Sequence, residues 1–283
     1  MLTLRVLESE SDRILLDRFL ELHRDSSMFL RSNLRRSGLT YHPRPFHGTY
    51  VAAFQGEACV GAAAHYWNGH LVLQAPGDVE ELALACTKRS GREVMGLSGP
   101  LDQVHRARTA LGLADIPAVM DSDETLYALN LTDLVVPTQL LDGSVTCRPP
   151  WPREREQVCL WRIAYDIETL GGVDSENARA GAAQWLDSLI ADGSVWVAVA
   201  GGELVSLSAF NAVLPDIVQL GGIYTPPLHR GKGYAKAAVA ASLLTARERG
   251  ATRAVLFTDN PSAERSYEAV GFRRVGDFGL VCF

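Results

Sequence analysis

The stretch that decides the fold is QLGGIYTPPLHRGKGYA, residues 219–235. It begins with a short apolar strand, Leu220 to Tyr224, which runs through two glycines and stops at Pro226-Pro227. A glycine-punctuated loop, Arg230 to Gly233, then opens directly onto a helical pattern. Backbone N–H groups in such a loop and in the first helical turn attract an anion, and the helix dipole adds partial positive charge. The stretch therefore predicts a strand, loop and helix that bind a phosphate group.

Two glycines and three cations suit this loop to a diphosphate. Gly231 and Gly233 allow positive φ and close approach of the backbone, and Arg230, Lys232 and Lys236 add full charges at the rim. The spacing excludes two common nucleotide cradles. The P-loop requires Ser or Thr after its lysine, where Gly233 stands, and the dinucleotide motif requires a third glycine at position 236, which is lysine.

The loop resembles motif A of the GCN5-related N-acetyltransferase (GNAT) family, [QR]-x-x-G-x-[GA], through Arg230, Gly233 and Ala235. The approach Gly-Ile-Tyr-Thr-Pro-Pro is similar to strand four of that family, with the closest likeness to the glycine N-acyltransferase-like (FR47-like) branch. A second motif of the family is similar to Asn260 through Phe272, at the expected distance downstream. The resemblance covers roughly residues 145–283 well, and the first half of the chain in outline.

The resemblance implies a coenzyme. In the family, the loop amides hold the pyrophosphate of coenzyme A and the preceding strand pairs with the pantetheine arm. It therefore implies acetyl-CoA, or another acyl-CoA, as co-substrate, and no metal. The implied coenzyme contacts are Ile223, Tyr224, Thr225, Arg230, Gly231, Lys232, Gly233, Tyr234, Ala235, Asn260 and Tyr267.

Tyr267 is the expected proton donor to the departing thiolate. It follows Asn260 by about two helical turns, so both side chains can face the coenzyme from one helix. A phenol with a pKa near 10 can donate a proton to a thiolate whose conjugate acid has a pKa near 8.5, which is the role of the matching tyrosine in the family. The alternative is a core tyrosine stacked on Phe272.

Next to the thioester, the Gly221-Gly222 pair predicts a bulge, with a backbone N–H near Ile223 or Tyr224 to hold the oxyanion.

The base is where the sequence departs from the family pattern. Family members with a strand-four glutamate carry it where this chain has Gln219. An amide does not take a proton, although it can hold a water in line. Three alternatives stay open: a water held by Gln219, Asp216 or Glu203 reaching into the site, or an acceptor with a low-pKa amine such as an α-amino group, about 8.

The first half of the chain looks like a second, degenerate copy of the same fold. Val51–Phe54 and the strand to Tyr66 match the hairpin that starts with Val197–Ala200, and both halves end a helix at a similar glycine turn. The segment from Gln74 to Glu81 has one glycine and three acids where a diphosphate needs donors and positive charge. Arg108 stands where the second half has Tyr267, so we expect no coenzyme in this half.

The fold class that follows is α/β, with two tandem GNAT-like domains, each a twisted mixed sheet, mostly antiparallel, flanked by helices. The proline-rich stretch 137–152 marks the boundary. The predicted domains are residues 1–136, without a coenzyme cradle, and residues 144–283, which are catalytic.

Composition limits the remaining possibilities. The 283 residues are 47% hydrophobic and 21% charged, as in a globular protein with sizeable cores, and a net charge of −6 disfavours nucleic acid as a partner. Because there is no run of about 20 apolar residues and no signal-peptide core, we expect a cytoplasmic protein that does not bind membranes. The 5 cysteines include no C-x-x-C pair, which argues against disulfides and structural zinc.

The sequence thus predicts an N-acyltransferase that moves the acyl group of acetyl-CoA to a primary amine by direct attack in a ternary complex. The acceptor is a small molecule or a peptide, and the protein is a monomer or a homodimer. The alternative is a non-catalytic protein that binds acyl-CoA or a partner, which Gln219 and the degenerate first half favour.

Overall fold

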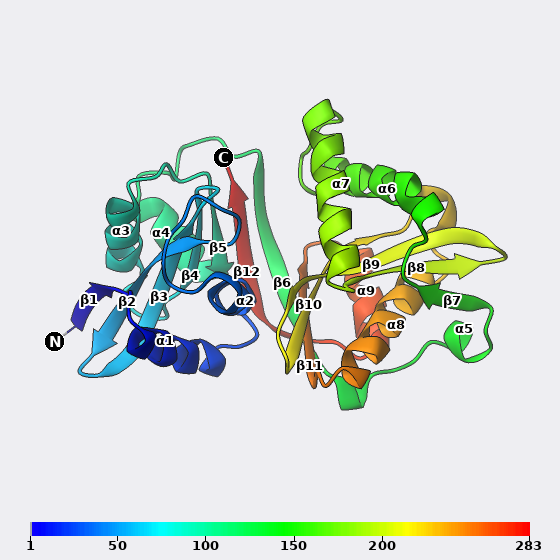
Figure 1. Ribbon diagram of the computed structural model, residues 1–283, viewed down its shortest axis with the longest axis horizontal. Helices are drawn as coiled ribbons and strands as arrows, with labels where there is room; N and C mark the ends of the chain where they lie inside the picture. The colour runs from blue at the N-terminus through cyan, green and yellow to red at the C-terminus, as the bar shows by residue number, and fades with distance from the viewer. Residues whose placement is uncertain (1) are drawn as a thin grey trace. The chain divides into compact units, whose positions relative to one another are not determined.

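The computed structural model of the protein describes residues 2–283, which form two compact units (Figure 1). The first unit contains residues 2–126 and 275–283, and the second contains residues 127–274. Two strands, β6 (Met120–Asn130) and β12 (Arg273–Cys282), begin in one unit and end in the other.

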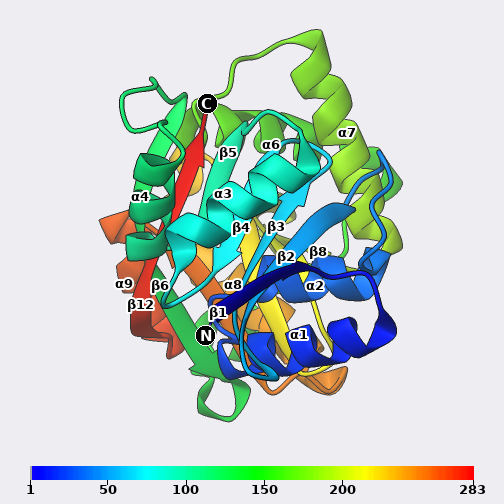
Figure 2. The ribbon, with the colours of Figure 1, turned by 90° about the vertical axis from the view of Figure 1, so that its left-hand side faces the viewer.

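The first unit is a mixed sheet with two helices on each face. Its strand order is β1-β2-β3-β4-β5-β12. The strands are β1 (Leu2–Val6), β2 (Gly48–Gln55), β3 (Ala58–Tyr66), β4 (His70–Gln74) and β5 (Gly96–Pro100). The helices are α1 (Glu10–Leu22), α2 (Met28–Ser37), α3 (Val79–Ser90) and α4 (Leu101–Ala110). Separate apolar cores join α1 and α2 to one face and α3 and α4 to the other (Figure 2).

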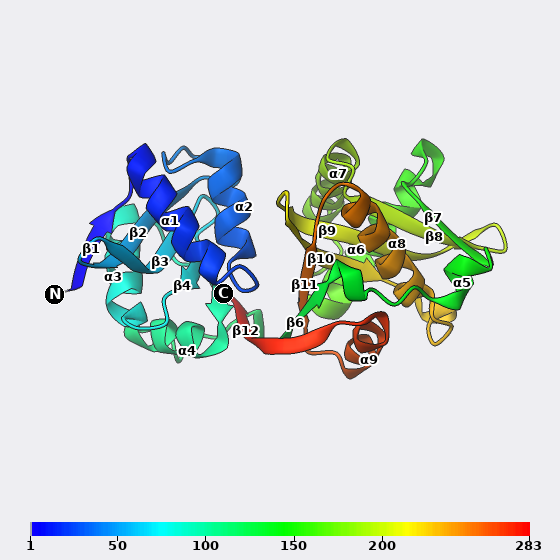
Figure 3. The same cartoon turned by 90° about the horizontal axis from the view of Figure 1, so that it is seen from below.

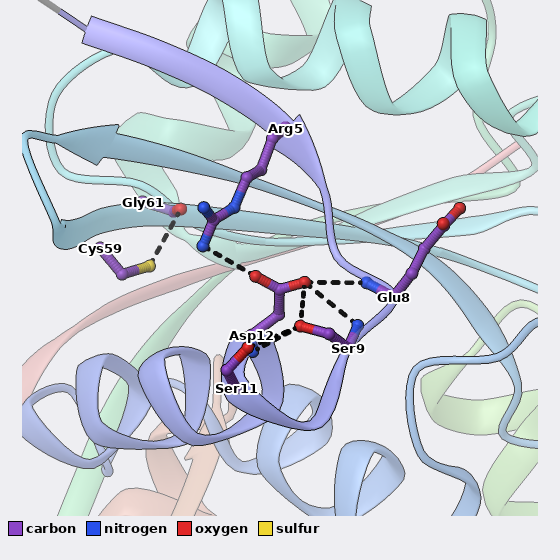
Figure 4. Close-up of polar contacts among 7 residues, drawn as sticks. All are labelled: Arg5, Glu8, Ser9, Ser11, Asp12, Cys59 and Gly61. Atoms are coloured by element: carbon purple, nitrogen blue, oxygen red, sulfur yellow. Dashed lines mark hydrogen bonds and ion pairs between the residues drawn. The ribbon is translucent and has the colours of Figure 1, made fainter.

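Local polar contacts decide where α1 begins. The Ser9 hydroxyl accepts the backbone N–H of Asp12 at 3.1 Å, and the Asp12 carboxylate accepts the N–H of Ser9 at 3.1 Å (Figure 4). This reciprocal pair is a capping box, and Arg5 adds an ion pair to Asp12 at 2.7 Å. The segment from Glu10 to Ser37 thus forms two helices, α1 and α2.

The second unit is built on the order β6-β11-β10-β9-β8-β7. Its own strands are β7 (Val145–Arg148), β8 (Val195–Ala200), β9 (Glu203–Val213), β10 (Ile217–Tyr224) and β11 (Arg253–Thr258). Its helices are α5 (Thr138–Leu141), α6 (Arg155–Thr169), α7 (Glu176–Ala191), α8 (Tyr234–Glu248) and α9 (Pro261–Val270). Short 3-10 turns cover Leu131–Asp133, Pro152–Glu154 and Pro227–His229.

Alternation along the strands separates two cores in the second unit. On β8, Val195 and Val197 pack in the core under α6 and α7, whereas Trp196 between them packs in the core under α8 and α9. Figures 1 and 3 accordingly show α6 and α7 on one face of β8 to β10 and α8 on the other. The mixed α/β fold and the flanking helices predicted from the sequence are confirmed.

The two units differ from the predicted domains at two strands. Residues 278–282 of β12, expected to close the second domain, pair antiparallel with residues 96–100 of β5 in the first unit. Conversely, the end of β6 from Tyr127 onward, expected in the first domain, belongs to the second unit. The apolar patterns identify both segments as strands, but such a pattern carries no information on which sheet edge a strand joins.

Candidate active site

Two parallel strands part in the second unit. β10 pairs with β11 from Ile217, opposite Arg253, to Gln219, opposite Val255. Although both strands continue, to Tyr224 and Thr258, no further pair between them forms within residues 2–283. The inner edges of the parted strands therefore expose backbone groups that an extended ligand can pair with, as in strand addition.

The bulge predicted at the glycine pair is present in β10. The register against β9 shifts between Gln219 and Leu220 and again between Gly221 and Tyr224. Gly222 has φ +65°, and a Cβ there would lie 3.2 Å from Cζ2 of Trp185. A Cβ on Gly221 would lie within 2 Å of the Asn211 amide, far inside contact distance. Backbone conformation and close packing both require glycine here.

The loop before α8 presents a row of unpaired donors. Within residues 2–283, no hydrogen bond engages the backbone N–H groups of residues 231–236, and the first bond beyond them joins the Ala237 N–H to Gly233 O at 3.2 Å. Gly231 (φ +75°) and Gly233 (φ +82°) lie in the left-handed region, which turns successive N–H groups into a concave nest. The predicted anion cradle therefore has the necessary donors, at the positive end of α8.

Not every predicted contact of the loop faces the anion. The Arg230 guanidinium donates to Glu168 Oε2 at 2.6 Å and to Thr225 O at 2.9 Å, so it is bonded to the end of α6 and to β10. Lys232 is exposed and stays at the rim. Gln139 of α5, which the sequence analysis did not single out, donates from Nε2 to Lys232 O at 3.1 Å and supports the loop from outside.

Asn260 and Tyr267 lie on α9, as predicted. Asn260 is the N-cap: its Oδ1 accepts the N–H groups of Ser262 (2.9 Å) and Ala263 (3.2 Å), which leaves Nδ2 as its donor to a ligand. Tyr267 is 8% exposed, and its ring lies 6.1 Å from the Phe272 ring, edge-on. The packing of the Tyr267 ring against Phe272 is what the core alternative predicts. The phenol nevertheless lies on the helix that Asn260 caps.

Gln219 lies where β10 and β11 part. It is 2% exposed, and its Nε2 has no hydrogen-bond partner among residues 2–283. A buried amide nitrogen without a partner is unfavourable, so this group is suited to hold a water or a ligand atom.

The other two base candidates lie farther along the strands. Asp216 precedes Gly221 by 5 residues, which corresponds to roughly 16 Å of strand. Glu203 precedes Ala209, the partner of Gly221 on β9, by 6 residues, or roughly 20 Å. Gln219, at the fork itself, lies nearer than either of them, and a base role for Asp216 or Glu203 stays a prediction.

The face of the bulge opposite α8 is lined by residues that the sequence analysis did not assign to the site. Arg162 Nη1 lies 3.4 Å from the position of a Cβ on Gly222, and its guanidinium lies 4.7 Å above the Trp185 ring. Asp166 holds Arg162 in place with a 2.8 Å ion pair, while burial raises the pKa of this carboxyl. The i,i+4 spacing of Arg162 and Asp166 on a predicted helix was a signal that could have identified the pair. Trp185 is half-buried beside the bulge.

The matching place in the first unit is built differently. There the N–H of Ala75, at the start of the loop before α3, is bonded at 2.6 Å to the side chain of the buried Gln103. A Cβ on Gly99 would lie 2.6 Å from Leu73 O, so the backbones of β4 and β5 stay in contact. Arg108, at the position of Tyr267, bonds to Leu113 O at 3.0 Å.

Residues 2–283 lack two further features. None of the helices combines the length and the apolar character that crossing a bilayer requires. No cluster of three or more His, Cys, Asp or Glu side chains is arranged to hold a metal ion.

Parts of this chain are similar to known proteins. Residues 150–272 match the model of the Acetyltransferase (GNAT) family. A curated relative, "N-acetyltransferase family 8 member 2" of Rattus norvegicus, is 38% identical over 97 residues, 32% of this chain and 43% of the relative. A second, "Probable N-acetyltransferase family 8 member 5" of Mus musculus, is 37% identical over 100 residues, 33% of this chain and 44% of the relative. The chain thus spans less than half the length of these curated relatives.

Solved structures extend the likeness to both units. A "Tandem GNAT protein from the clavulanic acid biosynthesis pathway" superposes with a TM-score of 0.53 at 15% identity, covering 99% of this chain and 97% of the other. A GCN5-related N-acetyltransferase from Kribbella flavida gives a TM-score of 0.58 at 19% identity, covering 92% and 94%. At these identities the likeness establishes the fold alone. Residues 150–272 thus resemble the GNAT acetyltransferase family, and the solved structures show the same fold over both units.

Proposed function

We propose that the second unit is an N-acetyltransferase, which takes the acetyl group from acetyl-CoA and transfers it to a primary amine of a small molecule or peptide. The observation that carries this proposal is the row of unpaired N–H groups at residues 231–236, directly beside the parted strands β10 and β11. A diphosphate fits the row of N–H groups, and an extended pantetheine arm fits between the parted strands. The family match to residues 150–272 supports the same activity.

The chain's residues divide the work of coenzyme binding. The N–H groups of Gly231, Gly233 and Ala235 hold the diphosphate, with Lys232 at the rim, while Asn260 donates from Nδ2. Residues 223–225 and Tyr234 make the remaining coenzyme contacts that were predicted from the resemblance. The first unit, whose loop and first turn of α3 carry Asp78, Glu80 and Glu81 where the second unit has cations, does not bind coenzyme in this proposal.

The chemistry is direct attack in a ternary complex. The amine nitrogen bonds to the thioester carbon, and a backbone N–H of the bulge near Ile223 or Tyr224 stabilises the charge on the carbonyl oxygen. The carbon–sulfur bond then breaks, the phenol of Tyr267 gives its proton to the sulfur, and the amine loses a proton. Gln219 assists the last step by holding a water at the fork, and the phenol is restored from solvent.

A thiol-release assay tests the activity. Purified protein is mixed with acetyl-CoA and a broad panel of primary amines, and free coenzyme A is measured. Amine-dependent release is the expected result, and calorimetry should show acetyl-CoA binding with one site per chain. Release with none of the amines, despite binding, would refute catalysis.

One observation favours a second candidate, a protein that binds acyl-CoA without transferring the acyl group. The position of the family's glutamate base is a buried glutamine. This candidate predicts tight coenzyme binding with no product from any acceptor. Mass analysis of a metabolite extract incubated with isotopically labelled acetyl-CoA separates the two, because the enzyme produces labelled amides and the binding protein does not.

A further inference from the structure

Glu168, on the last turn of α6, joins the helix to the coenzyme loop. Its Oε1 accepts the phenol of Tyr224, the final residue of β10, at 2.9 Å. Its Oε2 accepts the guanidinium of Arg230 at 2.6 Å, and Arg230 directly precedes the first glycine of the loop. The two oxygens of one carboxylate therefore have two different partners, one on the strand and one on the loop.

These two partners are not equally fixed. Tyr224 is 7% exposed and packs in the core between the sheet and α6, so its phenol keeps the carboxylate in position. The ion pair with Arg230 is half exposed, with 49% of the Arg230 side chain and 42% of the Glu168 side chain accessible. Ion pairs exposed to this extent contribute little to stability, so Arg230 can change partner at small cost.

The geometry points to Glu168 as the carboxylate that binds a cationic group of the acceptor, with Arg230 occupying that place until coenzyme A is bound. This inference rests on the proposed function. A diphosphate in the loop brings negative charge next to Arg230 and competes with Glu168 for the guanidinium. Once Arg230 turns to the diphosphate, Oε2 is free to accept an ammonium donor, which matches the guanidinium in charge.

The surroundings of Glu168 support a role on the acceptor side. α6 covers the face of β10 opposite α8, and it brings Arg162 to Gly222 in the middle of the bulge. The neighbouring acid Asp166 is paired with Arg162 within the same helix. Glu168 differs from Asp166 because the cationic partner of Glu168, Arg230, comes from the coenzyme loop. Acceptor and coenzyme sites are therefore coupled through Arg230, and such coupling is reciprocal.

Binding of n-butylammonium chloride, a primary amine that stands in for the acceptor, tests the inference without turnover. Its dissociation constant is measured by NMR shift titration, with and without saturating coenzyme A. Wild-type protein is expected to bind it at least fivefold more tightly with coenzyme A. Arg230→Gln should bind it equally well in both conditions, at the affinity of the coenzyme-bound wild type. Glu168→Gln should lose at least fivefold in amine affinity and retain its affinity for coenzyme A.

Controls separate the possible results. Glu203→Gln removes an exposed acid at the start of β9, roughly 13 Å along the strand from Leu207, the partner of Tyr224, and should behave as wild type. If coenzyme A binds but the amine affinity is the same with and without it, or is unchanged in Glu168→Gln, the inference is overturned while the proposed function stands. If wild type does not bind coenzyme A, the proposed function itself fails. If Glu168→Gln melts at a much lower temperature, the result for Arg230→Gln alone decides whether the inference holds. This variant keeps the hydrogen bond between the Tyr224 phenol and Glu168.

Discussion

Replacing Gly233 with aspartate is the sharpest test of the anion cradle. A carboxylate at this position would lie about 5 Å from a bound diphosphate, where each pair of unit charges repels by about 1 kcal/mol in water and about 3 kcal/mol at an effective dielectric constant of 20. With about two phosphate charges, the loss is at least about 2 kcal/mol. Since about 1.4 kcal/mol corresponds to a factor of ten, the affinity for acetyl-CoA should fall at least about 20-fold.

The same substitution has a separate effect on stability. Gly233 has φ +82°, and a side chain in the left-handed region costs about 1–2 kcal/mol. The melting temperature should therefore fall by only a few degrees, roughly 2–4 °C per kcal/mol, and the protein stays folded at 25 °C.

Gly201→Asp provides the matched control. Gly201, in the exposed turn between β8 and β9, has φ +58° and open space around its Cβ position, so the variant carries a similar backbone strain and the same charge. Calorimetric titration with acetyl-CoA should give wild-type affinity for Gly201→Asp and a loss of at least about 20-fold for Gly233→Asp. Affinity within threefold of wild type in Gly233→Asp would refute the assignment of the loop as the diphosphate site.

Three further predictions follow from the described contacts. Tyr267→Phe should lower kcat at least tenfold in the thiol-release assay and leave the acetyl-CoA Kd within twofold; an unchanged kcat would make Tyr267 a core residue on Phe272. Arg148→Ala removes the two 2.7 Å bonds to Glu154 that lower the pKa of this carboxyl, so the variant should lose about 1–2 kcal/mol of unfolding free energy at pH 7. The loss should shrink as the pH falls through the lowered pKa of Glu154, because the protonated acid no longer pairs; an equal difference at pH 3 and pH 7 in urea unfolding contradicts this reasoning. Gly99→Ala places a Cβ 2.6 Å from Leu73 O, so it should destabilise the first unit by about 1–3 kcal/mol and leave the acetyl-CoA Kd unchanged, as thermal melts and calorimetry would measure.

Local patterns in the sequence were sufficient for the cradle. The glycines at 231 and 233, the asparagine before Pro261 and the glycine pair at 221–222 each determine a backbone conformation that needs no distant partner. A few adjacent residues specify each of these features: the loop with positive φ, the helix N-cap and the bulge. This is why they could be predicted.

The acceptor side could not be predicted in the same way. Glu168 reaches Arg230 across 62 positions of the chain, and Trp185 lies against Gly222, so neither contact has a local pattern. The distances that separate Asp216 and Glu203 from the bulge likewise depend on the register of β10 against β9, and not on the residue types.

The sequence by itself therefore determined the kind of fold, the positive-φ loop before α8 and the helix that carries Tyr267, because backbone conformation depends on neighbouring residues. Only the tertiary structure decided that Arg230 bonds to Glu168, that Gln219 is buried with no partner for Nε2 among residues 2–283, and that the last strand pairs with β5. The physical reason is that charge pairs, burial and the choice of sheet edge are set by groups far apart in the chain, which meet only when the cores under both faces of the sheets have formed.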